Sequence, residues 1–398
     1  MRFALLEIIA DLHAGRHMDQ ATEDFVQEIA LGLGMDALPH IGVDQIDQVE
    51  LPIIFVRSGG TEGLFKSMYD RLPEPYLLLA TGLHNSLAAS LEILSFLRQQ
   101  GKQAEILHGD TGYIVERVQM WAKLQQVRRE LTNTRLGVIG QPSDWLIASD
   151  VDYQAAKERL GVTLLDIPMG ELQAEIVQGK DVPQEELERI VSLGVHQQTA
   201  RGALRIYHAL KLLVERHHLN GLTIRCFDLL GEFQNTGCLG VAMLNDAGIV
   251  AGCEGDVASL LSMVVLGKLA GEPVFMANPS RVDVQRNEVV VAHCTVPLTM
   301  TERYTFDTHF ESGLGIGIRG VIREGRGTIF KLSGDLASYF TSGLSIVQNL
   351  CEENLCRTQL QLKLDESVEY FLRDPIGNHH IICRGDISQL VNQFFSLE

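Results

Sequence analysis

The stretch IIFVRSGGTEG at residues 53–63 decides the fold class, because an apolar run passes there directly into a glycine-rich loop. Residues 53–56 predict a buried strand, since a short apolar run bounded by turn residues is typical of one. The loop at 57–63 either binds an anion through main-chain N–H groups at the start of a helix or forms a tight structural turn. It matches neither a phosphate-binding loop nor a complete dinucleotide fingerprint. The stretch therefore predicts an α/β domain without nicotinamide chemistry.

The same alternation of apolar runs and amphipathic stretches continues on the C-terminal side of this loop. Residues 76–80 predict the next strand. Leucines at three- and four-residue spacing then predict a helix that packs on the sheet; they are Leu87, Leu91, Leu94 and Leu97. After a linker at 132–134, residues 136–140 open a second α/β unit. Strands that alternate with helices in this way predict parallel sheets.

From about Pro279 the sequence pattern changes, and it predicts short strands and glycine-rich turns in place of alternating strands and helices. Residues 358–364 alternate polar and apolar side chains, as a half-buried strand should. The sequence therefore predicts an α/β protein with three domains. They are an N-terminal α/β domain at 1–133, a second α/β domain at 134–278 and a β-rich C-terminal domain at 279–398.

The composition excludes several classes of protein. The formal charge of −18 argues against a nucleic-acid or membrane partner, because phosphate-rich surfaces attract basic proteins. No apolar stretch reaches the ~18–20 residues of a membrane span, and a charged residue comes too early for a signal peptide. No pair of the seven cysteines has C-x-x-C spacing. We expect a cytoplasmic protein that acts on a small molecule.

The acidic segment at residues 253–256, Cys-Glu-Gly-Asp, is the first candidate for chemistry. Glu254 and Asp256 are separated by one glycine, between an apolar run and the start of a buried helix. Asp256 alone is explained as a helix N-cap. An N-cap does not explain a second acid beside small residues that leave open space.

Histidines provide the other candidates. His293 lies in an apolar strand, where a core role is the more common one. His379 and His380 are adjacent, so on a strand their side chains point to opposite faces and only one can serve a single site. Histidine together with carboxylates is a ligand set that suits manganese. The combination predicts a metal site.

With these segments, the chain resembles the L-fucose isomerase and L-arabinose isomerase family, in its shorter fucose isomerase-like branch, over nearly the whole length. The matching segments are short acidic, histidine-containing or glycine-containing motifs at 59–62, 226–228, 240–244, 253–256, 293–294 and 377–379. The resemblance implies two Rossmann-like domains with parallel sheets followed by a β-rich domain. It also implies a homo-oligomer whose active sites lie between subunits.

The resemblance further implies a manganese ion, Mn2+, held by two acids and a histidine of the C-terminal domain. In this chain the implied ligands are Glu232, Asp256 and His379. Glu232 and Asp256 are also the implied catalytic acids, which move a proton between C1 and C2 of a sugar through an enediol. A second alignment places Gln234 at the first acid. Alternative ligands are Glu254 for Asp256, and His380 or His293 for His379.

The implied activity is a metal-dependent aldose–ketose isomerase acting on a monosaccharide or a modified monosaccharide. The predicted substrate-binding residues are Asn378, Gln234, Thr61 and Glu62. A non-catalytic sugar-binding or regulatory protein, and a metal-dependent epimerase or lyase, are the alternatives on the same fold. Arginines in the glycine-rich C-terminal segment are either an anion contact or solvated charges; they are Arg319, Arg323 and Arg326.

Overall fold

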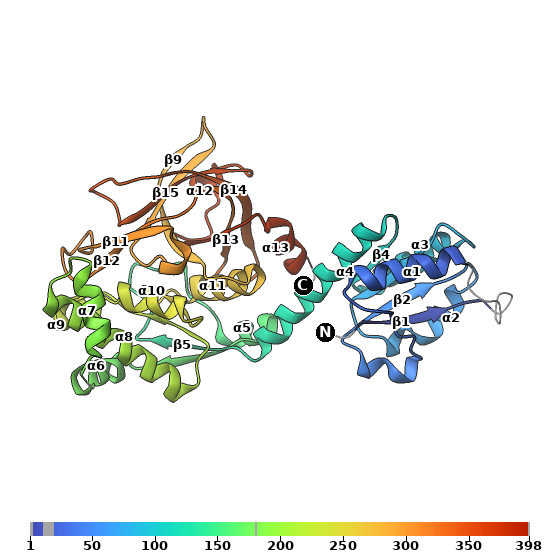
Figure 1. Cartoon of the computed structure of the whole chain (residues 1–398), viewed down its shortest axis with the longest axis horizontal. Coiled ribbons are helices and arrows are strands. Elements are labelled where there is room, and N and C mark those ends of the chain that lie inside the picture. The colour runs from blue at the N-terminus through green and yellow to red at the C-terminus, as the bar shows by residue number, and fades with distance from the viewer. Residues whose placement is uncertain (1–2, 11–19, 180, 397–398) are drawn as a thin grey trace. The chain divides into compact units, whose positions relative to one another are not determined.

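The computed structural model describes residues 3–10, 20–179 and 181–396. These residues divide into two units: unit 1 ends at Gln126 and unit 2 begins at Val127 (Figure 1). Within the described part of the chain, none of the helices combines the length and the apolar character needed to cross a membrane.

Unit 1 is built on a parallel sheet of four strands in the order β1-β2-β3-β4. Every residue of β2 and β3 is buried, as continuous apolar runs require in a sheet covered on both faces. The strands are β1 (Phe3–Ile8), β2 (Leu51–Val56), β3 (Tyr76–Ala80) and β4 (Ala104–Leu107). The helices are α1 (Gln20–Gly32), η2 (Val43–Gln48), α2 (Glu62–Met68), η3 (Tyr69–Arg71) and α3 (Ser86–Gln99), where η marks a 3-10 helix. Helix α4 (Thr111–Thr132) begins in unit 1 and continues past Gln126 into unit 2.

Unit 2 begins with a second parallel sheet of four strands in the order β6-β5-β7-β8. Its first strand, β5, lies between β6 and β7, so the chain turns back beside β5. Ligands of such sheets bind at the carboxyl ends of the strands near this reversal. The strands are β5 (Arg135–Ile139), β6 (Thr163–Ile167), β7 (Gly221–Ile224) and β8 (Val250–Gly252). The helices are α5 (Tyr153–Leu160), α6 (Met169–Gln178), α7 (Gln184–Ser192), α8 (Gln197–His217), α9 (Asp228–Phe233), α10 (Cys238–Asp246) and α11 (Val257–Ala270).

The rest of unit 2 is β-rich and contains a closed antiparallel barrel in the order β10-β15-β14-β13-β16-β9. Closure leaves the barrel without exposed edge strands. Its strands are β9 (Phe275–Asp283), β10 (Glu288–His293), β13 (Gly325–Leu332), β14 (Tyr339–Asn349), β15 (Thr358–Leu364) and β16 (His380–Arg384). Additional elements are η4 (Leu298–Met300), the hairpin of β11 (Arg303–Asp307) and β12 (Gly317–Val321), α12 (Tyr370–Arg373) and α13 (Ser388–Phe395).

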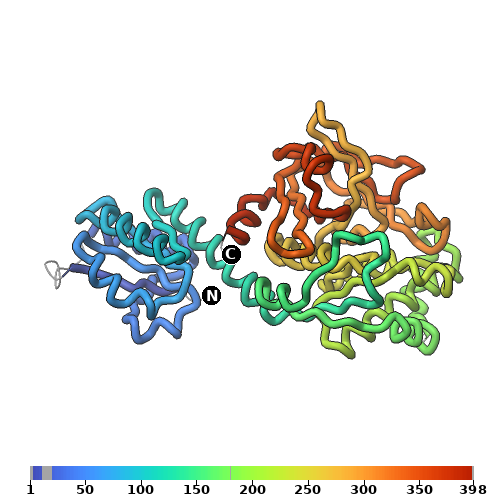
Figure 2. Tube along the Cα trace, turned by 180° about the vertical axis from the view of Figure 1, so that it is seen from behind, coloured from blue at the N-terminus to red at the C-terminus, as the bar shows by residue number. Residues whose placement is uncertain are grey.

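Helix α11 joins the second sheet to the barrel. It contacts β7 and β8 of the sheet and β9, β13 and β16 of the barrel. Figures 1 and 2 show α10 and α11, in yellow, between the green strands of the sheet and the orange and red strands of the barrel. Eleven of the residues of α11 are buried, because the helix is apolar on all sides. Its N-terminus therefore lies where the carboxyl edge of the sheet meets the barrel.

The predicted fold class is confirmed, since two parallel sheets are followed by a β-rich region. The strands predicted at 76–80 and 358–364 match β3 and β15 at both ends. The division into domains at 133/134 and 278/279 stays a prediction.

Candidate metal centre

A tight turn at residues 253–256 links β8 to α11 at the carboxyl edge of the second sheet. Gly255 has a φ of +69°, and a Cβ at this position would lie 2.6 Å from the main-chain oxygen of Gln141. Only glycine fits such a backbone and such a close approach. The main-chain nitrogen of Ser143 donates to the carbonyl oxygen of Glu254 over 2.9 Å. The loop after β5 is thereby fixed against the turn that carries both acids.

Three side chains converge above this turn: Glu254, His293 and His379. One potential ligand atom of each lies within 4.8 Å of the others. Glu254 belongs to the turn, His293 ends β10, and His379 directly precedes β16. The side chain of Glu254 is 11% exposed and that of His379 is fully buried. We call these residues the metal cluster; solvent reaches it along the carboxylate rather than along the His379 ring.

The His379 ring is engaged on one side and open on the other. Its Nδ1–H donates to Oδ2 of Asp256 over 2.9 Å. Its Nε2 lies within ion-pair distance of Oε1 of Glu254, at 3.3 Å, but forms no hydrogen bond with it. Nε2 thus remains a buried polar atom that no described residue satisfies. Such an atom is costly unless water or a cation binds it.

Asp256 lies behind His379 and is fully buried. It is the N-cap of α11, and its Oδ1 accepts from the main-chain nitrogen of Ser259 over 2.8 Å. Its Oδ2 accepts from the Ser259 hydroxyl over 2.7 Å and lies 3.7 Å from the buried ammonium of Lys331. Both oxygens are therefore already bound. A carboxylate that holds the far nitrogen of a metal-binding histidine is the usual support of such a ligand.

The other two members of the cluster are also held by neighbours. The Nδ1 of His293 forms a hydrogen bond of 2.8 Å with the hydroxyl of Thr295, which leaves Nε2 for a ligand. The indole nitrogen of Trp145 donates to Oε2 of Glu254 over 2.6 Å. Each side chain of the cluster thus has one fixed atom and one atom that remains for a ligand.

Burial and mutual contacts shift the pKa values of the cluster. Burial raises the pKa of Glu254, but His379 and the hydrogen bond from Trp145 outweigh it and lower it to about 2. Burial lowers the pKa of His379, but Asp256 and Glu254 raise it to about 9. Burial, together with His379, lowers the pKa of His293 to about 3. Near neutral pH Glu254 is therefore ionised, His293 is neutral and His379 carries a proton that a cation would replace.

Two of the predicted residues lie in or beside helix α9. Glu232 is exposed, and its Oε2 accepts a hydrogen bond of 2.6 Å from the Gln173 side chain. Gln234 follows the helix with a φ of +47°, and its side-chain amide donates to the carbonyl oxygen of Leu230. Neither is part of the metal cluster. Their predicted roles as metal ligand, catalytic acid and substrate contact stay predictions.

The remaining predicted residues are spread over both units. Asn378 is exposed, and its main-chain oxygen contacts the His380 ring. His380 itself is buried and packs against aromatic rings, including Tyr370, as the alternation of a strand requires. In unit 1, the Thr61 hydroxyl donates to the carbonyl oxygen of Ser58, and Glu62 opens α2. The substrate-binding roles of Asn378, Thr61 and Glu62 stay predictions.

Sequence reasoning did not identify three residues that hold the cluster: Trp145, Thr295 and Lys331. A role for Lys331 could have been predicted, because a lysine among the apolar residues of β13 needs a buried partner for its charge. Thr295 and Trp145 gave no such indication, since both contacts depend on how loops fold onto the sheet and the barrel.

The residues present fit a divalent cation. Two imidazoles and a carboxylate are a ligand set used for several first-row metals. The buried Nε2 of His379 and the buried hydroxyl of Ser143 lack hydrogen-bond partners among the described residues. Ser143 contacts Glu254 through its main chain. The cluster is thus a possible metal site, and its geometry does not distinguish one metal from another.

Comparison with known proteins finds no family model that matches the chain. It is similar to several curated sulfoquinovose isomerases. That of Priestia aryabhattai is 23% identical over 265 residues, which is 63% of this chain and 59% of the relative. Those of Alkalicoccus urumqiensis and Clostridium sp. (strain MSTE9) are each 24% identical, over 53% and 46% of this chain and 49% and 42% of their own length. The chain therefore spans about three fifths or less of the relatives it matches. The similarity supports a sugar isomerase family without singling out the L-fucose and L-arabinose isomerases.

Proposed function

We propose that the chain is a divalent-metal-dependent aldose–ketose isomerase of a modified monosaccharide, with sulfoquinovose as the first substrate to test. The observation that carries this proposal is the metal cluster, in which the buried Nε2 of His379 lies beside Glu254 and His293 without a hydrogen-bond partner of its own. Similarity to sulfoquinovose isomerases supports the reaction class.

A divalent cation held by these residues would act as a Lewis acid on sugar oxygens and stabilise the negative charge of an enediolate. The chain prepares its ligands for this role. Asp256 holds Nδ1 of His379 and Thr295 holds Nδ1 of His293, so that both Nε2 atoms face the cluster. Trp145 is 52% exposed, so its indole face remains available to a sugar ring while its N–H holds Glu254. We infer manganese because oxygen-rich sugar ligands and mixed nitrogen and oxygen protein ligands suit it.

Isomerisation also needs a carboxylate that takes a proton from C2 and returns it to C1. Glu232 and Asp256 are the acids that the resemblance to the fucose and arabinose isomerases implies. Glu254 is the acid that lies in the cluster and is partly exposed. Loss of a catalytic acid or base lowers kcat by roughly 10²–10⁴. E232Q, D256N and E254Q therefore separate the three assignments when kcat and metal content are measured on the same preparations.

The test of the whole proposal is to purify the chain, measure bound metal by mass spectrometry, and assay ketose formation from sulfoquinovose and a panel of aldoses. We expect about one divalent cation per chain, turnover that EDTA abolishes, and recovery with Mn2+. The proposal fails if the chain neither retains a cation nor forms a ketose.

Further measurements on the purified chain distinguish the alternative functions. Calorimetry that shows sugar binding unaffected by EDTA, without turnover, would favour a non-catalytic sugar-binding protein. A product other than a ketose would favour an epimerase or a lyase. The proposal also includes a homo-oligomer with active sites between subunits, which light scattering of the purified chain tests directly.

A further inference from the structure

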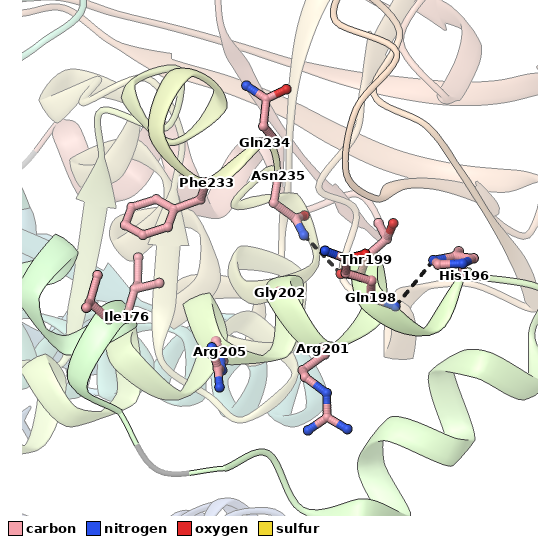
Figure 3. Close-up of a pocket in the computed structure, with 11 residues that line it drawn as sticks. Ile176, His196, Gln198, Thr199, Arg201, Gly202, Arg205, Phe233, Gln234 and Asn235 are labelled. Carbon is pink, nitrogen blue, oxygen red and sulfur yellow. Dashed lines mark hydrogen bonds between the residues drawn. The ribbon is translucent and has the colours of Figure 1, made fainter.

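A cavity of about 600 Å³ lies in unit 2 between α6, α8 and the end of α9, and none of the three residues of the metal cluster lines it. Its lining is drawn in Figure 3. A second cavity of about 450 Å³ adjoins it and shares Ile176 and Arg205. The volume is that of a site for a small molecule. We call the first of these the α8 cavity.

The cationic wall of the α8 cavity is made by Arg201 and Arg205, one helical turn apart on α8 (Figure 3). Their nearest carboxylate is that of Asp181, at 4.0 Å from Arg201 and 3.6 Å from Arg205. The Asp181 side chain is 87% exposed, so this pairing is weak and easily exchanged. The Nε of Arg205 is buried and has no hydrogen-bond partner among the described residues. The two guanidinium groups are thus available to an anion.

Two of the three arginines in the glycine-rich C-terminal segment are paired with carboxylates, and the third, Arg323, is exposed. Arg319 donates to Asp307 over 3.1 Å, and Arg326 pairs with both Asp365 and Asp386. Their charges are already compensated by carboxylates. Arg319 and Arg326 are therefore less available to an anion than the two arginines of α8.

The opposite side of the α8 cavity is rigid and partly apolar. The Asn235 amide donates to the carbonyl oxygen of Thr199 over 2.9 Å. A Cβ at Gly202 would lie 2.5 Å from that amide, so α8 and the segment after α9 are in close contact. Ile176 and Phe233 add an apolar surface. A bare inorganic ion would leave this surface unused.

We propose that the α8 cavity binds a small organic anion, in which a phosphate or sulfonate group sits between Arg201 and Arg205. The carbon body of the ligand lies against Ile176 and Phe233. A planar guanidinium matches such oxyanions in two-point hydrogen bonds, and hydrogen bonds to charged groups are the strong ones. This site is additional to the metal cluster and does not depend on isomerase activity.

The test is isothermal titration of the full chain in EDTA with phenyl phosphate, benzenesulfonate, inorganic phosphate and phenol. We expect at least one of the two organic anions to bind, inorganic phosphate to bind more weakly and phenol not to bind. The ratio of phenyl phosphate to benzenesulfonate affinity tells whether the site prefers a phosphate or a sulfonate. Absence of binding by both organic anions would overturn the proposal.

Variants make the test specific to this cavity. R205Q should weaken binding at least about tenfold, because it removes a charged hydrogen-bond donor. R323Q removes the same charge from an exposed loop and is the matched control, with binding unchanged. D181N should strengthen binding about two- to fivefold, since it removes an exposed competing carboxylate. A misfolded variant cannot bind more tightly, so equal effects of R205Q and R323Q, or weaker binding in D181N, would each contradict the site.

Discussion

The metal cluster and the α8 cavity show two ways in which the same unit arranges charged side chains. In the cluster, each imidazole has its Nδ1 fixed by a neighbour, and His379 is fully buried. In the cavity, the arginine side chains are 35% and 39% exposed and face a carboxylate at 3.6–4.0 Å. Fixed and desolvated groups favour a compact ion at one geometry. Half-exposed groups with exchangeable partners favour a larger ligand whose position can adjust.

The largest expected effect is on metal binding, from His379→Gln. The variant removes the proposed nitrogen ligand, whose Nδ1–H donates to Asp256, so we expect Mn2+ binding to fall below detection in calorimetry. The matched control is His196→Gln, which changes a histidine of the α8 cavity and should leave Mn2+ affinity unchanged. If the H379Q chain kept its affinity, the metal cluster would not be the metal site.

The second prediction compares the stability lost when the cation is removed from a buried ion pair and from a half-exposed one. Lys331→Met leaves the buried carboxylate of Asp256 without its cation, and breaking a buried pair in this way destabilises by about 3–5 kcal/mol. R205Q removes an equal charge from a half-exposed pair, and its effect should stay within about 0.5 kcal/mol. Urea unfolding of both variants measures the difference. The double variant D256N/K331M should recover part of the loss, and equal stabilities of K331M and R205Q would contradict the comparison.

The fold was predictable as far as it depends on local patterns. Strands such as β3 and β15 follow from apolar runs and alternation within a few residues. The closed barrel was not predicted, because it requires β16 to pair with both β9 and β13. The β16–β9 pairing joins residues about a hundred positions apart and the β16–β13 pairing joins residues more than fifty apart, and periodicity within one strand does not specify its neighbours.

For the site, the sequence predicted several of the residues better than it predicted how they are arranged. The sequence singled out Glu254, Asp256 and His379, and the structure brings all three together. It did not show that Glu254, at a φ of +64°, faces the cluster while Asp256 lies behind the histidine. For His293 the sequence favoured a core role, because a lone histidine in an apolar strand is usually a core residue. Its place in the cluster depends on the barrel, which brings the end of β10 next to the segment before β16.

Asp256→Asn tests that order of ligand and support. A residue that orients a metal-binding histidine typically changes metal affinity by 10–100-fold, so we expect a loss of about this size with Mn2+ still bound. Calorimetry of D256N beside H379Q decides between the two roles. If both variants lost binding completely, Asp256 would act as a ligand, as the resemblance to the fucose and arabinose isomerases implies.

The smallest effect is expected from Thr295→Val, which keeps the shape of the side chain but removes the hydroxyl that fixes Nδ1 of His293. The ring then loses a neutral hydrogen bond rather than a charged one, and neutral bonds stabilise less. We expect Mn2+ affinity to fall about tenfold, at the low end of the range for supporting residues. The exposed Thr299→Val is the control, since its hydroxyl donates to Asp246 away from the cluster. An affinity loss in T295V as large as that in D256N would mean that the hydroxyl and the carboxylate support their histidines equally. The buried charge of Asp256 and Lys331 would then contribute stability rather than metal affinity.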